Sequence, residues 1–249
     1  MKLVINEKYI KKYKTIGNYA TISSLLILAL GLVFAFSKDM TRILYSYVAL
    51  VVGFVLTQVG MYFVNRFGRN PRYDEVLTTA FEKLRHDYTF YVFSAPVPLL
   101  LSGPCGLWIV TPITATGTIS YEDGKWKQRG SNALLRFMGQ EGIGNPDKDL
   151  QEKEDNLRKY LSSHGIPADQ QPPVKQVMVV MLKKTQVGEV SKAAVPIVEL
   201  EEVKRFIRRV DREECATPLS PDAQARINTV LQTGQSAPQT LEGFEADKS

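Results

Sequence analysis

The chain has 249 residues, which is long enough for one or two domains with a buried core. Its formal net charge is +5 and its hydrophobic content is 44%, values that exclude a polytopic transporter, a collagen-like chain and a wholly disordered protein. An excess of Lys and Arg is also typical of nucleic-acid-binding proteins. However, residues 1–72 contain ten basic and two acidic residues, a net charge of +8, which leaves −3 on residues 73–249. The basic character therefore belongs to the N-terminal part of the chain.

Two uncharged stretches, residues 16–36 and residues 43–64, dominate this N-terminal part. Each has the roughly 20 residues that a helix needs to cross about 30 Å of hydrocarbon. Because only a short turn separates them, the two predicted transmembrane helices must form an antiparallel hairpin. The first stretch also resembles a cleavable signal peptide, with Ala35 and Ser37 at a small-residue cleavage site. Its apolar run exceeds the roughly 7–15 residues of a signal sequence and a second span follows at once, so we expect an integral membrane protein.

The basic residues lie before the first span and after the second, whereas the connecting turn contains two basic residues and Asp39. Short flanks rich in Lys and Arg remain in the cytoplasm, so both termini are expected there. The lipid bilayer is the first predicted partner, and the basic flanks favour anionic lipids. Ala49, Gly53 and Thr57 recur every four residues in the second span, a spacing that allows close helix packing within the hairpin or in a homo-oligomer; small residues that face lipid are the alternative.

The remainder of the chain predicts a domain that mixes helices and strands. Apolar residues with helical spacing follow Asn70-Pro71 as far as about His86, and Asn145-Pro146 begins a second helix. Between these helices, β-rich runs suggest a consecutive, largely antiparallel meander; they span residues 88–94, 97–101, 106–113 and 116–128. The later elements are a central strand at 174–182, an edge strand at 193–198 and an amphipathic helix at 200–210.

These observations predict the organisation of the whole chain. It comprises a basic cytoplasmic N-terminus (1–15), two transmembrane helices (16–36 and 43–64), an α/β domain (71–212), and a C-terminal short helix with a disordered tail (213–249). The two cysteines give neither a disulfide framework nor the spacing of a zinc site, which is typical of a reducing compartment. Cys105 is expected to be a small packing residue.

Residues 99–119 resemble the centre of the nuclease-related domain (NERD) family, a branch of the PD-(D/E)XK nuclease-like fold. The turn of the family matches Gly103, Pro104 and Gly106, and the apolar strand after it matches residues 107–110. The glycine that begins the next strand of the family matches Gly117. The resemblance extends roughly over residues 71–209. It implies a restriction-endonuclease-like α-β-β-β-α-β domain.

The same resemblance places the catalytic positions of the family on residues unsuited to the reaction. Nucleases of this kind bind a divalent metal with an acid on one strand, and with an acid and a Lys two residues apart on the next. These positions fall on Pro98, Thr111 and Ile113. Pro has no ligand atom, Thr lacks the charge to bind a hard dication, and Ile cannot stabilise phosphate charge. The resemblance therefore implies a domain without nuclease activity or cofactor that binds or scaffolds a partner at the cytoplasmic face of the membrane.

A second hypothesis is a metal-dependent nuclease with relocated ligands, which would use Mg²⁺. Glu75 lies where some relatives carry an auxiliary carboxylate, and Glu122, Asp123 and Lys125 cluster in a predicted hairpin. A solvated helix face and the turn chemistry of Asp123-Gly124 explain these residues equally well. Binding of nucleic acid without cleavage and binding of a protein partner both stay open, although the slightly acidic domain does not favour nucleic acid.

Overall fold

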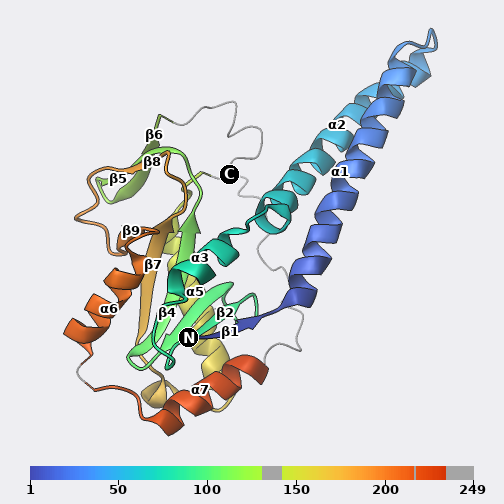
Figure 1. Cartoon of the computed structure of the whole chain (residues 1–249). Helices are drawn as coiled ribbons and strands as arrows, with labels where there is room; N and C mark the ends of the chain where they lie inside the picture. The colour runs from blue at the N-terminus through green and yellow to red at the C-terminus, as the bar shows by residue number, and fades with distance from the viewer. Residues whose placement is uncertain (131–141, 216, 234–249) are drawn as a thin grey trace.

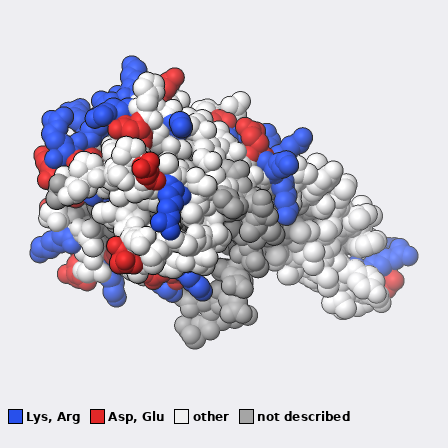
Figure 2. Space-filling model, turned by 90° about the horizontal axis from the view of Figure 1, so that it is seen from below, with Lys and Arg blue, Asp and Glu red and all other residues white. Residues whose placement is uncertain are grey.

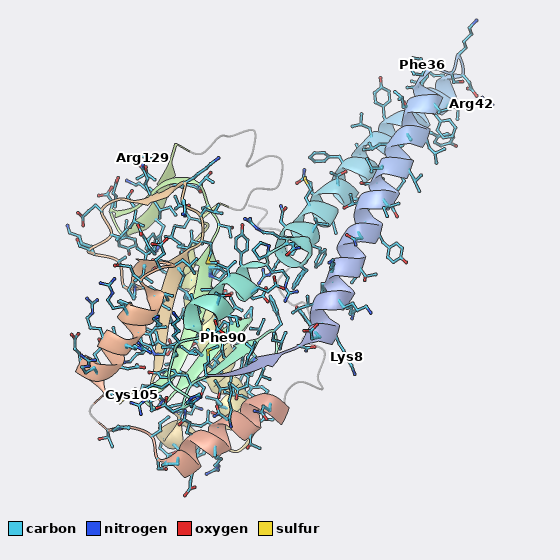
Figure 3. All side chains as sticks on the ribbon, viewed as in Figure 1. Lys8, Phe36, Arg42, Phe90, Cys105 and Arg129 are labelled. Atoms are coloured by element: carbon cyan, nitrogen blue, oxygen red, sulfur yellow. A yellow bond between two sulfur atoms is a disulfide. The ribbon has the colours of Figure 1, made fainter. Side chains whose placement is uncertain are left out.

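The computed structural model describes residues 1–130, 142–215 and 217–233. A mixed α/β domain carries a long helical hairpin that projects from one side of it (Figure 1). The hairpin consists of α1 (Glu7–Ala35) and α2 (Met40–Phe63), and a π-helical turn, η1 (Val64–Gly68), continues α2 toward the domain. In Figure 3, Phe36 and Arg42 mark the far tip of the hairpin and Lys8 marks its base.

The two helices of the hairpin pack against each other through glycines. A Cβ atom on Gly60 would lie 2.5 Å from Oγ1 of Thr21, and one on Gly31 would lie 2.8 Å from Cβ of Ala49. A Cβ on Gly53 would likewise meet the side chain of Leu28 at 2.6 Å. The predicted close packing of the second span at Ala49 and Gly53 is therefore realised within the hairpin.

The outer surface of the hairpin is apolar and exposed. Leu25, Val33 and Leu50 are each more than half exposed, and α1 and α2 are both long and apolar enough to cross a membrane. In Figure 2 the shaft of the hairpin is almost free of charged side chains, which gather at its tip and near the domain. A continuous apolar surface of this extent is unfavourable in water and favourable in lipid.

The segment before α1 is part of the domain and not a free basic tail. Residues Lys2–Ile5 form β1, which pairs in parallel with β2 (Thr89–Val92). The side chain of Asn6 then caps α1 by accepting a hydrogen bond from the backbone N–H of Tyr9 at 3.0 Å, so this helix begins well before the predicted residue 16. Cleavage of the first span as a signal peptide would remove this edge strand. This pairing attaches the N-terminal end of the hairpin to the domain, and η1 connects the other end to α3 of the same domain.

The main sheet has the strand order β1-β2-β3-β4-β7-β9. Its remaining strands are β3 (Leu99–Gly103), β4 (Gly106–Ile113), β7 (Val174–Val180) and β9 (Ile197–Glu199). β2, β3 and β4 form the predicted antiparallel meander, while β7 lies parallel to β4 with Thr111 opposite Met178. The order α3-β2-β3-β4-α5-β7 follows the predicted sequence of elements, and β9 lies at the edge as its Pro196 indicated.

The run of residues 116–128, predicted as the last part of the meander, does not belong to this sheet. This corrects the sequence prediction. β5 (Gly117–Glu122) and β6 (Lys125–Arg129) form a hairpin that joins β8 (Thr185–Val187) in a separate three-stranded sheet. The position beside β4 is taken by the apolar strand β7, so β5 has no partner there. Gly117, with φ of 89°, begins β5 in a conformation that favours glycine.

Helices cover both faces of the main sheet (Figure 1). α3 (Tyr73–Phe81) and α6 (Val203–Glu214) share one hydrophobic core with Phe90 and Val110, and α5 (Pro146–Ser163) and α7 (Pro221–Thr233) share the other with Tyr91 and Ile109. Neighbouring residues of a strand therefore serve opposite cores, as the period of two requires. The C-terminal helix, predicted to lie outside the domain, is part of it, because Ile227 and Leu231 are buried. The predicted disordered tail after it lies outside the described residues.

The two cysteines form a disulfide between the β3–β4 turn and the end of α6, with Cα atoms of Cys105 and Cys215 5.5 Å apart. This corrects the expectation that Cys105 is only a small packing residue, because a separation of 110 residues gives no sign of pairing in the sequence. Beside it, the buried carboxylate of Asp211 accepts hydrogen bonds from Tyr88 Oη at 2.6 Å and Trp108 Nε1 at 3.1 Å. This end of the domain is therefore fixed by covalent and polar contacts.

Candidate functional site: a basic pocket at the base of the hairpin

A cavity of about 920 Å³ lies where the hairpin joins the domain. Its wall is formed by η1, by the carboxyl-terminal half of β4, by the turn between β2 and β3, and by the first turns of α5. Ligand sites in proteins usually measure about 300–1,000 Å³ and are mostly apolar with a few polar groups. The size and the composition of this cavity both fit that description.

All three catalytic positions implied by the resemblance line this one pocket. Pro98 lies in the β2–β3 turn, whereas Thr111 and Ile113 lie on the face of β4 that α5 covers. The predicted positions therefore converge, although none of the three side chains carries charge. Thr111 instead accepts a hydrogen bond from Nζ of Lys153, on α5, at 3.2 Å.

The charges in the pocket come from residues that the sequence analysis did not select. Lys153 lines the pocket from α5, Arg66 lines it from η1, and Arg69 lines it from the residue that follows η1. Arg66 contacts the Tyr62 hydroxyl at 3.2 Å and Arg69 contacts the hydroxyl and the ring of Tyr73. Within the described part of the chain, no carboxylate lies within ion-pair distance of any of the three cations. They are therefore available to an anionic ligand.

Two carboxylates also line the pocket, and one of them is already paired. Asp74 is buried and accepts hydrogen bonds from Nε and Nη2 of Arg72, at 3.1 and 3.0 Å. Asp149 lies in the first turn of α5, where the helix dipole favours a negative charge. Among the described residues, Asp149 forms no ion pair. The pocket therefore holds three cations and one unpaired carboxylate, which gives it an excess of positive charge.

The ionisation of Lys153 reflects its surroundings. Burial lowers the pKa of this amine below its ordinary value, because the charged form loses hydration. The nearby Asp149 carboxylate opposes the lowering of that pKa, and the positive charge of Arg66 adds to it. Lys153 and Arg66 thus repel each other across the pocket, and an anion placed between them would relieve that repulsion.

The remaining candidates for a metal site serve structural roles elsewhere. Glu75 caps α3 by accepting a hydrogen bond from the backbone N–H of Arg72 at 2.9 Å, and it forms an ion pair with the same residue. Glu122 accepts hydrogen bonds from Lys127 and Arg129 across the β5–β6 hairpin, at 3.1 and 2.8 Å. These contacts lower the pKa of Glu122. The carboxylates proposed as relocated ligands are thus occupied by basic side chains.

Asp123 and Lys125 complete that hairpin. Asp123 and Gly124 both have positive φ, 54° and 75°, as a tight two-residue hairpin turn requires. The carboxylate of Asp123 contacts Nζ of Lys127 at 3.0 Å, and Lys125 lies opposite Glu122 in the strand register. Across the described residues, no three His, Cys, Asp or Glu side chains lie close enough together to hold a metal ion. At the hairpin, the carboxylates of Glu122 and Asp123 are engaged by Lys127 and Arg129 and do not converge as a ligand set for Mg²⁺.

The glycines of the motif turn allow close approach of the backbone. A Cβ on Gly106, whose φ is 122°, would lie 2.3 Å from the carbonyl oxygen of Pro173, and one on Gly103 would lie 2.5 Å from the ring of Tyr88. Between them, Pro104 and Cys105 form the two-residue connection from β3 to β4. This motif therefore sets the strand pairing and lies apart from the pocket.

The chain matches no protein-family model, no curated protein and no solved structure.

Proposed function

We propose that this protein is a membrane-anchored binding module related to the NERD family, without nuclease activity, whose domain lies at the cytoplasmic face of the membrane. The observation that carries the proposal is the convergence of Pro98, Thr111 and Ile113 in one pocket. Where a nuclease needs carboxylates for a divalent metal, this pocket presents apolar and hydroxyl groups together with three cations. Such a site suits retention of an anion and not hydrolysis of a phosphodiester.

The hairpin supplies the anchor. Its two helices expose apolar side chains around their circumference, and both of its ends attach to the same domain through β1 and η1. Lys and Arg at the base of the hairpin favour the cytoplasmic side. The spans contain no charged residue, and a transport pathway through them would usually need one, so anchoring is the role that their composition supports.

A protein partner or a homo-oligomer formed through the lipid-facing side of the hairpin remains compatible with this function. The Gly-rich face of α2 is already used within the hairpin, so an oligomer would have to use the exposed apolar face instead. Nucleic acid is a less favoured partner, because the net charge of residues 73–249 is −3.

A cleavage assay tests this proposal, using the full chain in lipid nanodiscs because β1 and the start of α1 belong to the domain. Single-stranded and double-stranded DNA and RNA are incubated with Mg²⁺ or Mn²⁺, and we expect no cleavage above that of empty nanodiscs. Metal-dependent cleavage that disappears in the variant Glu122→Ala with Asp123→Ala would overturn the proposal in favour of relocated ligands. Cleavage that this variant retains would overturn it as well, by placing a working site elsewhere in the chain.

A further inference from the structure

We propose that the basic pocket binds the phosphate group of an anionic membrane lipid, with part of the lipid chain against its apolar wall. This inference rests on the proposed function and names the ligand class of the same pocket. It is carried by three features: cations that have no carboxylate partner among the described residues, an apolar wall beside them, and the position of the pocket at the end of the membrane spans.

The cations are arranged as an anion site. Lys153 approaches from the domain side and Arg66 and Arg69 approach from the hairpin side, so that they face one cavity from different elements. A guanidinium offers five N–H donors, and the contacts of Arg66 and Arg69 with Tyr62 and Tyr73 leave most of these donors available. Arginine and lysine together are well suited to phosphate oxygens, the first through paired hydrogen bonds and the second as a point charge.

The wall beside the cations is apolar. Partly exposed apolar side chains contribute to it from the end of the hairpin, from the β2–β3 turn and from the ends of the strands; they are Val64, Phe93, Pro98, Pro112 and Leu182. A fully soluble anion such as inorganic phosphate would leave this surface in contact with water. A ligand that joins a phosphate to a hydrocarbon chain covers both kinds of surface.

The position of the pocket favours the bilayer as the source of that ligand. The uncharged part of the second span extends through Val64 and Asn65 to the first cation, Arg66, and all three residues line the cavity. The pocket therefore begins where the hydrocarbon is expected to end, at the level of the lipid phosphates. Anionic lipids are attracted to basic residues at this level, and a cavity there provides a defined position for one lipid.

Lipid retention by the full chain in detergent micelles, measured by native mass spectrometry, tests this inference. The protein is equilibrated with equimolar phosphatidylglycerol and phosphatidylcholine of identical acyl chains. We compare Lys153→Gln with Lys159→Gln, an exposed position on the same helix, and Arg66→Gln with Arg42→Gln at the far tip of the hairpin. Thermal unfolding of every variant verifies that it is folded.

We expect each protein to retain about one phosphatidylglycerol molecule, with at least a tenfold preference over phosphatidylcholine. This preference should fall about tenfold in the Lys153 and Arg66 variants and should not change in the two controls. Equal retention of both lipids, or an equal loss in the controls, would overturn the inference. Saturable binding of inorganic phosphate that depends on Lys153, without a lipid preference, would also overturn it and would leave the proposed binding function intact. The cleavage assay decides the proposed function independently.

Discussion

Nζ of Lys153 on α5 donates a hydrogen bond to Oγ1 of Thr111 on β4, at 3.2 Å. The resemblance to the NERD family places a metal-binding acid at Thr111. A partly buried amine therefore lies beside the position where, by that resemblance, a nuclease would hold a cation. Under the proposed relationship to that family, a cation would replace a cation-binding group here, which agrees with the proposed anion site.

Replacing Lys153 with Met is expected to stabilise the protein at neutral pH. Burial lowers the pKa of this amine in the folded state, whereas the unfolded chain keeps a value near 10.5. Between the two pKa values the unfolded state binds more protons, so the free energy of unfolding of the native sequence rises with pH across that window. Thermal unfolding at pH 7 and at pH above 10.5 measures the difference. The gain from Lys153→Met should shrink at high pH, and a gain that is equal at both pH values, or equal to that of Lys159→Met, would contradict this account.

Removal of the Asp211 carboxylate is expected to destabilise the domain by about 3–5 kcal/mol, because it leaves two buried donors unpaired and leaves Glu214 as the ion-pair partner of Lys175. Asp211 accepts hydrogen bonds from Tyr88 and Trp108 and forms an ion pair with Lys175 at 3.6 Å. Chemical denaturation of Asp211→Ala measures the loss. Glu213→Ala, an exposed position on the same helix, serves as the control and should change the stability by no more than about 0.5 kcal/mol.

Reduction of the disulfide is expected to lower the stability of the purified chain by about 2–4 kcal/mol, because the bond closes a long loop of the unfolded chain. Thermal unfolding with and without a phosphine reductant measures this effect. The double variant Cys105→Ser with Cys215→Ser should unfold near the reduced protein and should not respond to the reductant. A native chain that is equally insensitive would show that the bond contributes nothing.

The helix contact at Gly60 is expected to be sensitive to a single methyl group. A Cβ there would lie 3.0 Å from the backbone nitrogen of Thr21, so α1 and α2 would have to separate. Gly60→Ala should cost about 1–3 kcal/mol, as overpacking usually does. Thermal unfolding in detergent compares this variant with Leu50→Ala on the lipid-facing surface, and a larger loss for Leu50→Ala would contradict the packing described.

Local chemistry made several elements predictable from the sequence. Asn145 and Pro146 begin α5 as expected, with the Asn145 side chain accepting a hydrogen bond from the backbone N–H of Lys148, because capping depends on neighbouring residues. The strand partners of β1 and β5 were not predicted, because pairing depends on segments far away in the sequence. Either β5 or β7 could pair with the free edge of β4. Contacts between distant segments of the chain, which the sequence does not reveal, determine that β7 takes this position.

The sequence alone did not predict a pocket. A motif resemblance selected Pro98, Thr111 and Ile113, which do lie together, but it gave no reason to select Lys153. A charged residue on a helix normally indicates a solvated face. The one available signal was spacing, because Lys153 falls between Leu150 and Leu157 in the buried stripe of α5. Arg66 and Arg69 were interpreted only as membrane flanks, and their role in a cavity depends on how η1 meets the domain.

Two observations indicate different sides of the membrane for the domain. Lys and Arg at the base of the hairpin favour the cytoplasm, whereas a disulfide between Cys105 and Cys215 is more typical of an oxidising compartment. The charge flanks act during membrane insertion and determine topology directly. We therefore give the flanks more weight.

Cysteine accessibility tests the anchored, cytoplasmic domain most directly. Thr41→Cys marks the hairpin tip and Asn156→Cys marks an exposed position on α5, both without a change of charge. Right-side-out membrane vesicles that contain the full chain are treated with a membrane-impermeant maleimide, and labelling above that of the native sequence is recorded. We predict labelling at the tip alone in sealed vesicles, and at both positions once the membrane is permeabilised. Labelling of Asn156→Cys in sealed vesicles, or recovery of the chain in the soluble fraction, would contradict the central claim.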